Sequence, residues 1–140
     1  MKPRNRNDHR VIDKDCLEFL YDEVLVYCEN DTVSFSGYNQ NNNPFLKQLE
    51  SDLGFKFNSK MSEASKGQLD IFYFSCHTGK VKSWFKHLRN AVAHNRILKS
   101  SDNDVIIIED KYNDKLSMYA EITSFEKLKR IIKEIKKHYK

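Results

Sequence analysis

Arg89, Asn90 and His94 form the densest group of potentially reactive side chains in the sequence, within a stretch that runs from residue 83 to residue 97. A guanidinium presents paired donors that match the oxygens of a phosphate, and an imidazole takes up and releases a proton near neutral pH. Asn90 and His94 are four residues apart, so on a helix they project from the same side, where the amide can orient the imidazole. This spacing predicts a site that binds a phosphate and moves a proton.

The angle between Arg89 and His94 limits what one helix can do. Five residues correspond to about 140° around an ideal helix, so an undistorted helix does not aim both side chains at one phosphate. Either the last turn unwinds near Asn95, or a second copy of the chain supplies the missing partner across a two-fold axis. A plainer interpretation stays open, because a histidine near a helix end often serves only the helix dipole and an arginine on an amphipathic helix is usually a surface charge.

The elements around these residues are predicted from apolar spacing. A helix is expected over 80–94, after the break at Thr78-Gly79, and its core line comprises Val81, Phe85, Leu88 and Val92. Short strands are expected over 96–100 and 105–109, followed by a turn at 111–114 and a strand over 115–121. The continuous β-branched run at 105–108 indicates either a strand buried on both faces or a hairpin lying over helices.

The rest of the chain is expected to be largely helical. A helix over 14–29 has Asp13 as its cap, 30–43 is a connection, and a second helix begins at Pro44 and is closed by Gly54. A third helix fits 62–77, with a strand over 69–75 as the alternative because short apolar runs are ambiguous. A closing helix follows a cap at Thr123 or Ser124. Its lysine-rich face is expected to be exposed to solvent or, alternatively, to bind along the backbone of an RNA.

The run Leu88-Arg89-Asn90-Ala91-Val92-Ala93-His94-Asn95 resembles the Arg-Asn-x-x-x-His motif of HEPN domains, found in prokaryotic toxins and phage-defence ribonucleases. Asn95 stands where many members carry glycine, and asparagine also tolerates the left-handed conformation that ends a helix. The resemblance implies a mainly α fold, a HEPN-like helical bundle with a small β-hairpin between the motif helix and the C-terminal helix. It also implies a homodimer with both motifs lining one cleft.

The activity implied by this resemblance is that of a metal-independent endoribonuclease, acting as a toxin or phage-defence effector. His94 would be the acid/base for attack by the 2′-hydroxyl, Arg89 would stabilise the phosphate and Asn90 would assist. Candidate contacts to the RNA backbone are Lys80, Lys82, Lys86 and Arg96. An antitoxin or regulatory partner is possible, no cofactor is expected, and the alternative is a non-catalytic HEPN-like module that binds RNA, a nucleotide or a protein.

The composition constrains the domain organisation, the partners and the location of the protein. The 140 residues are expected to form one domain over 11–140 after a flexible basic arm at 1–10, and the formal net charge of +4 permits a polyanionic partner without requiring one. Three cysteines without CxxC spacing, together with the lack of a long apolar run, indicate a cytoplasmic protein with reduced thiols and no contact with a membrane. Zinc held by histidines and a divalent ion held by carboxylates around the hairpin are weak alternatives.

Overall fold

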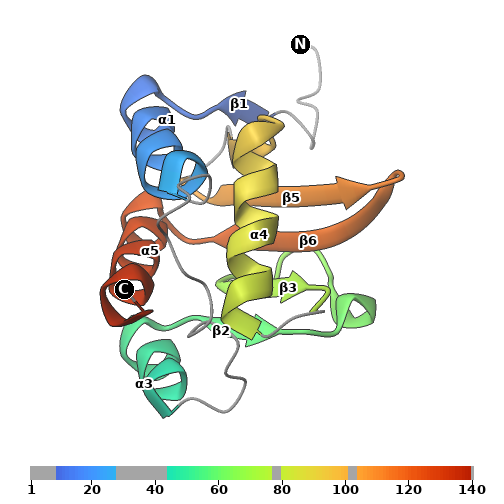
Figure 1. The fold of residues 1–140 in the computed structure, drawn as a ribbon. Coiled ribbons are helices and arrows are strands. Elements are labelled where there is room, and N and C mark those ends of the chain that lie inside the picture. Colours follow the sequence, from blue (N-terminus) through green and yellow to red (C-terminus); the bar gives the residue numbers. More distant parts are fainter. Residues whose placement is uncertain (1–8, 28–43, 77–79, 101–103, 140) are drawn as a thin grey trace.

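A six-stranded mixed sheet forms the centre of the molecule, with the strand order β1-β4-β5-β6-β3-β2 (Figure 1). The computed structural model describes residues 9–27, 44–76, 80–100 and 104–139. The strands are β1 (His9–Val11), β2 (Lys56–Asn58), β3 (Ile71–Phe74), β4 (Ile97–Ser100), β5 (Ile106–Tyr112) and β6 (Lys115–Ile122). The helices are α1 (Lys14–Leu20), which continues as the π-helix η1 (Tyr21–Val26), α3 (Pro44–Leu53), α4 (Lys80–Ala93) and α5 (Phe125–Tyr139), with a 3-10 turn η3 (Met61–Glu63).

The expected helical bundle with a small hairpin is therefore wrong, and the molecule is an α+β domain. The hairpin of β5 and β6 is present, but other strands flank it on both sides. Three consecutive isoleucines of β5, Ile106, Ile107 and Ile108, are all buried, so both faces of this strand are covered. Both interpretations of this β-branched run hold, because β5 is buried on both faces and its hairpin with β6 lies against α4.

The predicted helix over 62–77 is also wrong, and its strand alternative is confirmed as β3. Asp70 has φ 63° and Gly67 has φ 88°, conformations that interrupt a right-handed helix just before the strand. Phe72, Tyr73 and Phe74 are buried one after another, as both faces of a central strand require. β3 pairs antiparallel with β6 and parallel with β2, which the sequence did not predict.

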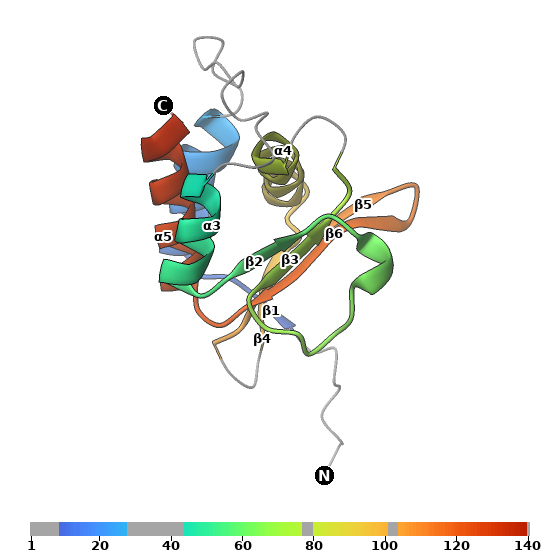
Figure 2. The ribbon, with the colours of Figure 1, turned by 90° about the horizontal axis from the view of Figure 1, so that it is seen from below.

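The helices gather on one face of the sheet, and α4 crosses β5 and β6 at a steep angle (Figures 1 and 2). The small Ala120 of β6 lies opposite Phe72 on one side and Ile108 on the other. Trp84 of α4 packs edge-on against Phe72, with ring centroids 5.5 Å apart. This contact with the sheet fixes the helix that carries the predicted site.

Several helix ends follow the predicted chemistry. Asp13 caps α1 by accepting a hydrogen bond from the amide of Cys16 at 3.0 Å, and Gly54 ends α3 with φ 71°. Ser124, one of two expected caps, accepts from the amide of Lys127 at the start of α5. Residues 28–43, where the first helix was expected to end and a connection to follow, lie outside the described residues.

The lysines of α5 make several contacts within the chain. Lys136 donates to the carboxylate of Glu23 at 3.0 Å and lies over the ring of Tyr27, while Lys129 and Lys133 lie over the ring of Phe19. These contacts attach α5 to the first helix, so part of the basic face has a structural role. Within the described residues, no helix is long and apolar enough to cross a membrane.

Candidate functional site

Three lines of side chains run along α4, and each has a different environment. The predicted apolar line of Val81, Phe85, Leu88 and Val92 is buried, as expected. Next to it, the spacing of His87, Asn90 and His94 places them on a polar line at positions i, i+3 and i+7. A third, basic line comprises Lys82, Lys86 and Arg89, at positions i, i+4 and i+7.

α4 ends at Ala93, but the helical hydrogen-bond pattern reaches His94. The amide of His94 donates to the carbonyl of Asn90 at 3.0 Å, the ordinary helical bond. Asn95 then takes φ 60°, and the amides of Asn95 and Arg96 donate to the carbonyls of Val92 and Ala91 in a Schellman arrangement. The left-handed residue comes after His94, so unwinding of the last turn does not bring His94 closer to Arg89.

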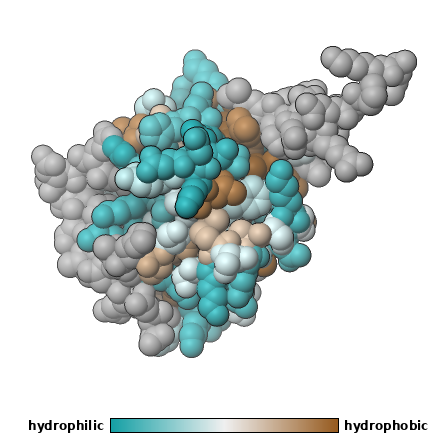
Figure 3. Space-filling model, turned by 90° about the vertical axis from the view of Figure 1, so that its right-hand side faces the viewer, coloured by the Kyte–Doolittle hydropathy of each residue, from teal (hydrophilic) through white to brown (hydrophobic). Residues whose placement is uncertain are grey.

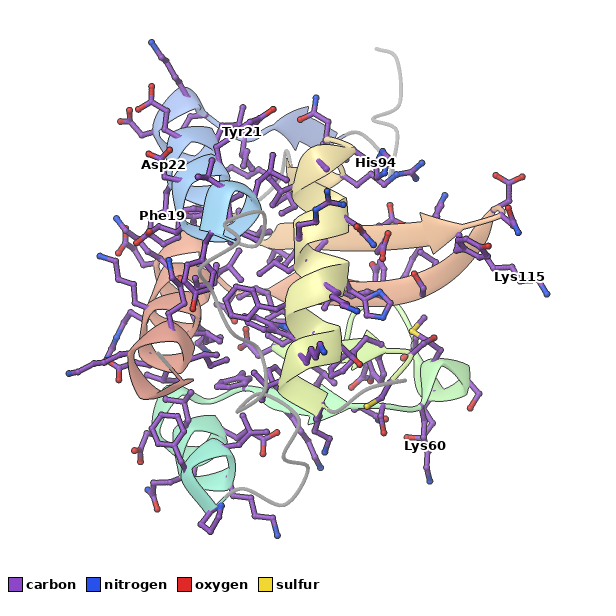
Figure 4. All side chains as sticks on the ribbon, viewed as in Figure 1. Phe19, Tyr21, Asp22, Lys60, His94 and Lys115 are labelled. Atoms are coloured by element: carbon purple, nitrogen blue, oxygen red, sulfur yellow. The ribbon has the colours of Figure 1, made fainter. Side chains whose placement is uncertain are left out.

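Arg89 and Asn90 are joined to each other, and Asn90 also reaches the sheet. The guanidinium of Arg89 donates through Nη1 to Asn90 Oδ1 at 3.0 Å. Asn90 Nδ2 in turn donates to Asp110 Oδ2 of β5 over a longer distance of 3.4 Å. This chain of contacts orients Arg89 and Asn90 relative to the sheet, whereas His94 lies exposed at the end of α4 (Figure 4).

His87 forms the second contact of the same carboxylate. Its Nδ1 lies 2.8 Å from Asp110 Oδ2, and its Nε2 lies 2.8 Å from the carbonyl oxygen of Ser75. An ionised carboxylate and a carbonyl only accept hydrogen bonds, so both contacts are hydrogen bonds when both ring nitrogens carry a proton. His87 therefore has a structural role, because both of its ring nitrogens are engaged, one by β5 and one by the residue that follows β3.

Asp110 is buried, and its surroundings stabilise the ionised form of its carboxyl group. Its side chain is 6% exposed, and that of His87 is 13% exposed. Burial by itself would raise the pKa of Asp110, but hydrogen bonds from His87 and Asn90 and the nearby charge of His87 outweigh it and hold the pKa below its usual value. The contact with His87 therefore compensates the buried charge of the Asp110 carboxylate.

The sheet explains why Asp110 faces α4. Ile106 and Ile108 lie on the side of β5 that α4 covers, and Asp110 continues this row at the same alternation. The pairing with β6 shifts register between Asp110 and Lys111, next to Ser117, whose hydroxyl donates to the carbonyl of Asp110 at 3.1 Å. The irregularity therefore lies where the apolar row gives way to the polar network.

A cavity of ≈ 480 Å³ opens beside this network, between α4 and the outer half of the β5–β6 hairpin. It is lined by Ser75, His87, Asn90, Asp110, Lys111, Tyr112, Lys115, Leu116 and Ser117. Figure 3 looks onto the side to which the hairpin tip points, where hydrophilic residues surround smaller apolar areas. Asn90 is the one member of the sequence motif that lines this cavity.

The predicted RNA contacts do not all lie near the motif. Lys86 and Arg96 are exposed, and both are close in sequence to the last turns of α4. Lys80 is half-buried at the other end of the helix, roughly 20 Å from His94 along the axis at 1.5 Å per residue. Lys82 is half-buried too, so Lys86 and Arg96 are the better placed pair.

Sequence reasoning missed the network of His87 and Asp110. Two signals were available: His87 shares a helix side with Asn90 and His94, and Asp110 shares a strand face with Ile106 and Ile108. The spacing of His87 suggested zinc and the carboxylates around the hairpin suggested a divalent ion. Among the described residues, no cluster of three or more histidine, cysteine or acidic side chains could hold a metal ion.

The Arg-Asn-x-x-x-His motif thus lies at the carboxyl end of α4, where Asn90 joins a polar network beside a cavity. The model of the HEPN pEK499 p136 family matches residues 23–140, and the chain belongs to this family. Comparisons with curated proteins and with solved structures give no match. The resemblance seen in the sequence is confirmed, although the sheet departs from the helical bundle that it implied.

Proposed function

We propose that this chain is a metal-independent endoribonuclease of the HEPN type. The observation that carries the proposal is the arrangement on α4, where Asn90 orients the guanidinium of Arg89 at 3.0 Å and His94 stands exposed one turn further on. An oriented cation and an accessible imidazole suit phosphoryl transfer, because one can stabilise charge while the other moves a proton.

The reaction proceeds by attack of the ribose 2′-hydroxyl on the adjacent phosphorus. His94 takes the hydroxyl proton or delivers one to the departing 5′-oxygen, and one histidine cannot do both in the same step. Arg89 stabilises the charge on the non-bridging oxygens as the new P–O bond forms and the old one breaks. The products are a 2′,3′-cyclic phosphate and a 5′-hydroxyl, with no net change in oxidation state.

A homodimer would resolve the geometry of this reaction. The amide of His94 keeps the helical bond to the carbonyl of Asn90, so about 140° separate Arg89 and His94 on one copy. A second copy related by a two-fold axis can bring its own His94 to the Arg89 of the first, and it also supplies the second proton-transfer group. Light scattering tests this part, and a monomer at micromolar concentration would contradict it.

The cleavage assay uses total RNA and purified tRNA in EDTA. We expect the wild-type chain to cut and His94→Ala to lose at least a hundredfold in rate, since acid–base catalysis contributes about 10²–10⁴-fold. Lys60→Ala is the control for loss of an exposed positive charge, because Lys60 lies on a different part of the surface (Figure 4). Circular dichroism and dimer mass should be unchanged in both variants.

The biological setting proposed for this activity is a toxin or phage-defence effector whose activity a partner protein restrains. Expression of the wild-type chain should then arrest bacterial growth, and His94→Ala should not. If His94→Ala cuts as fast as the wild type, the proposed mechanism is refuted. RNA binding without cleavage by the wild type would instead favour a non-catalytic module.

A further inference from the structure

The cavity beside α4 is lined mostly by residues that do not belong to the Arg-Asn-x-x-x-His motif. Its volume of ≈ 480 Å³ lies within the range of about 300–1,000 Å³ typical of small-molecule sites. Of the residues that line it, only Asn90 belongs to the Arg-Asn-x-x-x-His motif. The hairpin supplies most of the others, so the cavity is a property of the sheet that the helical motif does not account for.

Asp110 presents an acceptor to this cavity. Its Oδ2 is engaged by both His87 and Asn90. The residue is only 4% exposed, yet it lines the cavity. An ionised carboxylate has about four acceptor sites, so Oδ1 can accept a further hydrogen bond from a ligand that donates an N–H group.

The rim of the cavity carries an aromatic ring between two cations. Tyr112 is 74% exposed, which is unusual for so large a ring, and it ends the row that runs along β5 through Asp110. Lys111 and Lys115 are exposed on either side of it, with Lys115 near the tip of the hairpin (Figure 4). Exposed aromatic rings flanked by basic side chains are typical of surfaces that bind single-stranded nucleic acid.

We propose that this cavity is a nucleobase subsite, which takes one unstacked base of a single-stranded RNA next to the cleaved phosphate. The base lies against the ring of Tyr112 and donates an N–H group to Asp110 Oδ1, while Lys111 and Lys115 contact the flanking phosphates. This inference rests on the proposed ribonuclease function for its choice of ligand. It adds a source of substrate preference, which the motif alone does not provide.

A binding assay separates the subsite from catalysis. The probe is a fluorescent octamer of 2′-O-methyl adenosine, which cannot be cleaved because it has no free 2′-hydroxyl. Tyr112→Ala should weaken binding about tenfold or more, and Tyr112→Phe should not, because stacking needs only the ring. Tyr21→Ala is the matched control, since Tyr21 is a tyrosine 50% exposed on the first helix, on the opposite side of the view in Figure 4.

Two altered probes divide the contacts to the base from the contacts to the backbone. An octamer of abasic 2′-O-methyl ribose phosphate should bind wild type and Tyr112→Ala equally, whereas Lys115→Ala should weaken binding of both this octamer and the adenosine octamer. Replacing adenine with purine removes the N–H donors but keeps the stacking surface. We expect this change to weaken wild-type binding about tenfold, as for the loss of a hydrogen bond to a charged group.

The outcomes distinguish this inference from the proposed function. Equal binding of the adenosine octamer by wild type and Tyr112→Ala would overturn the subsite, even if His94→Ala abolishes cleavage. Equal binding of the adenine and purine octamers would overturn the role of Asp110. If the wild type fails to cut RNA but the octamer results follow expectation, the subsite stands and the catalytic proposal fails.

Discussion

The pair formed by His87 and Asp110 should dominate the stability of the site, and replacing Asp110 by alanine tests this. Removing one partner of a buried ion pair costs roughly 3–5 kcal/mol, because the other charge is left without compensation. The side chains here are 13% and 6% exposed, so some water reaches the ring and the lower end of that range applies. We therefore expect Asp110→Ala to lower the free energy of unfolding by about 3 kcal/mol, which for a domain of this length corresponds to about 10 °C in Tm.

A double-mutant cycle identifies the cause of this loss. Asp110→Ala, His87→Ala and the double variant are unfolded in urea at pH 7, with fluorescence of the single tryptophan, the fully buried Trp84, as the signal. The double variant should cost less than the two single losses together, by about 2 kcal/mol, because the second substitution removes the charge that the first left behind. Asp104→Ala is the control, since its pair with Lys99 is exposed and should contribute less than about 1 kcal/mol.

The pH dependence has a definite sign. The folded state lowers the pKa of Asp110, so the stabilisation from its ionised form is present above the pKa of the unfolded chain, about 3.9. It is lost as the pH falls through the still lower pKa of the folded state. The difference in stability between wild type and Asp110→Ala should therefore shrink below about pH 4. An Asp110→Ala variant as stable as the wild type at pH 7, or strictly additive losses in the cycle, would refute this account of the network.

Three smaller perturbations test local conformation and burial. Gly54→Ala should lower Tm by about 3 °C, because the φ of 71° disfavours a side chain and imposes a strain of about 1 kcal/mol. The new Cβ would not clash, since its nearest atom would be Lys127 Nζ at 3.5 Å. A Tm equal to that of the wild type would contradict this expectation. Asn95→Gly should keep or slightly raise Tm and Asn95→Ala should lower it, as calorimetry of both would show, because φ is 60° there. Burial, with help from Asp13, raises the pKa of the Cys16 thiol to about 12. In a variant whose other two cysteines are replaced by serine, alkylation of Cys16 at pH 8 should be more than a hundredfold slower in the folded protein than in the protein unfolded by urea.

Elements with strong local signals were predicted correctly. The helix α4 carries an apolar line at regular spacing, and α3 begins at Pro44 and is closed by Gly54. The β5–β6 hairpin turns at Asn113 and Asp114, within the predicted turn, with φ 51° and 65°. Each signal is contained within a few residues, so it needs no knowledge of the partner elements. The candidate site on α4 was located for the same reason, because its residues share one helix.

The fold class was wrong because a sheet depends on partners that lie far apart in sequence. β1 pairs with β4, and His9 lies opposite Ser100. A strand of three residues is too short for its sequence pattern to predict which strand it pairs with. The run from Ile71 to Phe74 is short enough to fit one turn of a helix or a buried strand. The left-handed conformation of Asp70 decided between them, and it depends on hydrogen bonds from Thr123, 53 residues away.

The site joins two kinds of residue that should respond differently to substitution. Asn90 connects Arg89 to a buried carboxylate, so its loss should disturb both the fold and the guanidinium. His94 has an exposed ring with no hydrogen bond to the described residues, so its loss should leave stability unchanged. A fall in cleavage on His94→Ala would therefore report chemistry, whereas a fall on Asn90→Ala would include positioning. Arg89→Lys separates the two further, because lysine keeps the charge but lacks the planar fork that Asn90 orients.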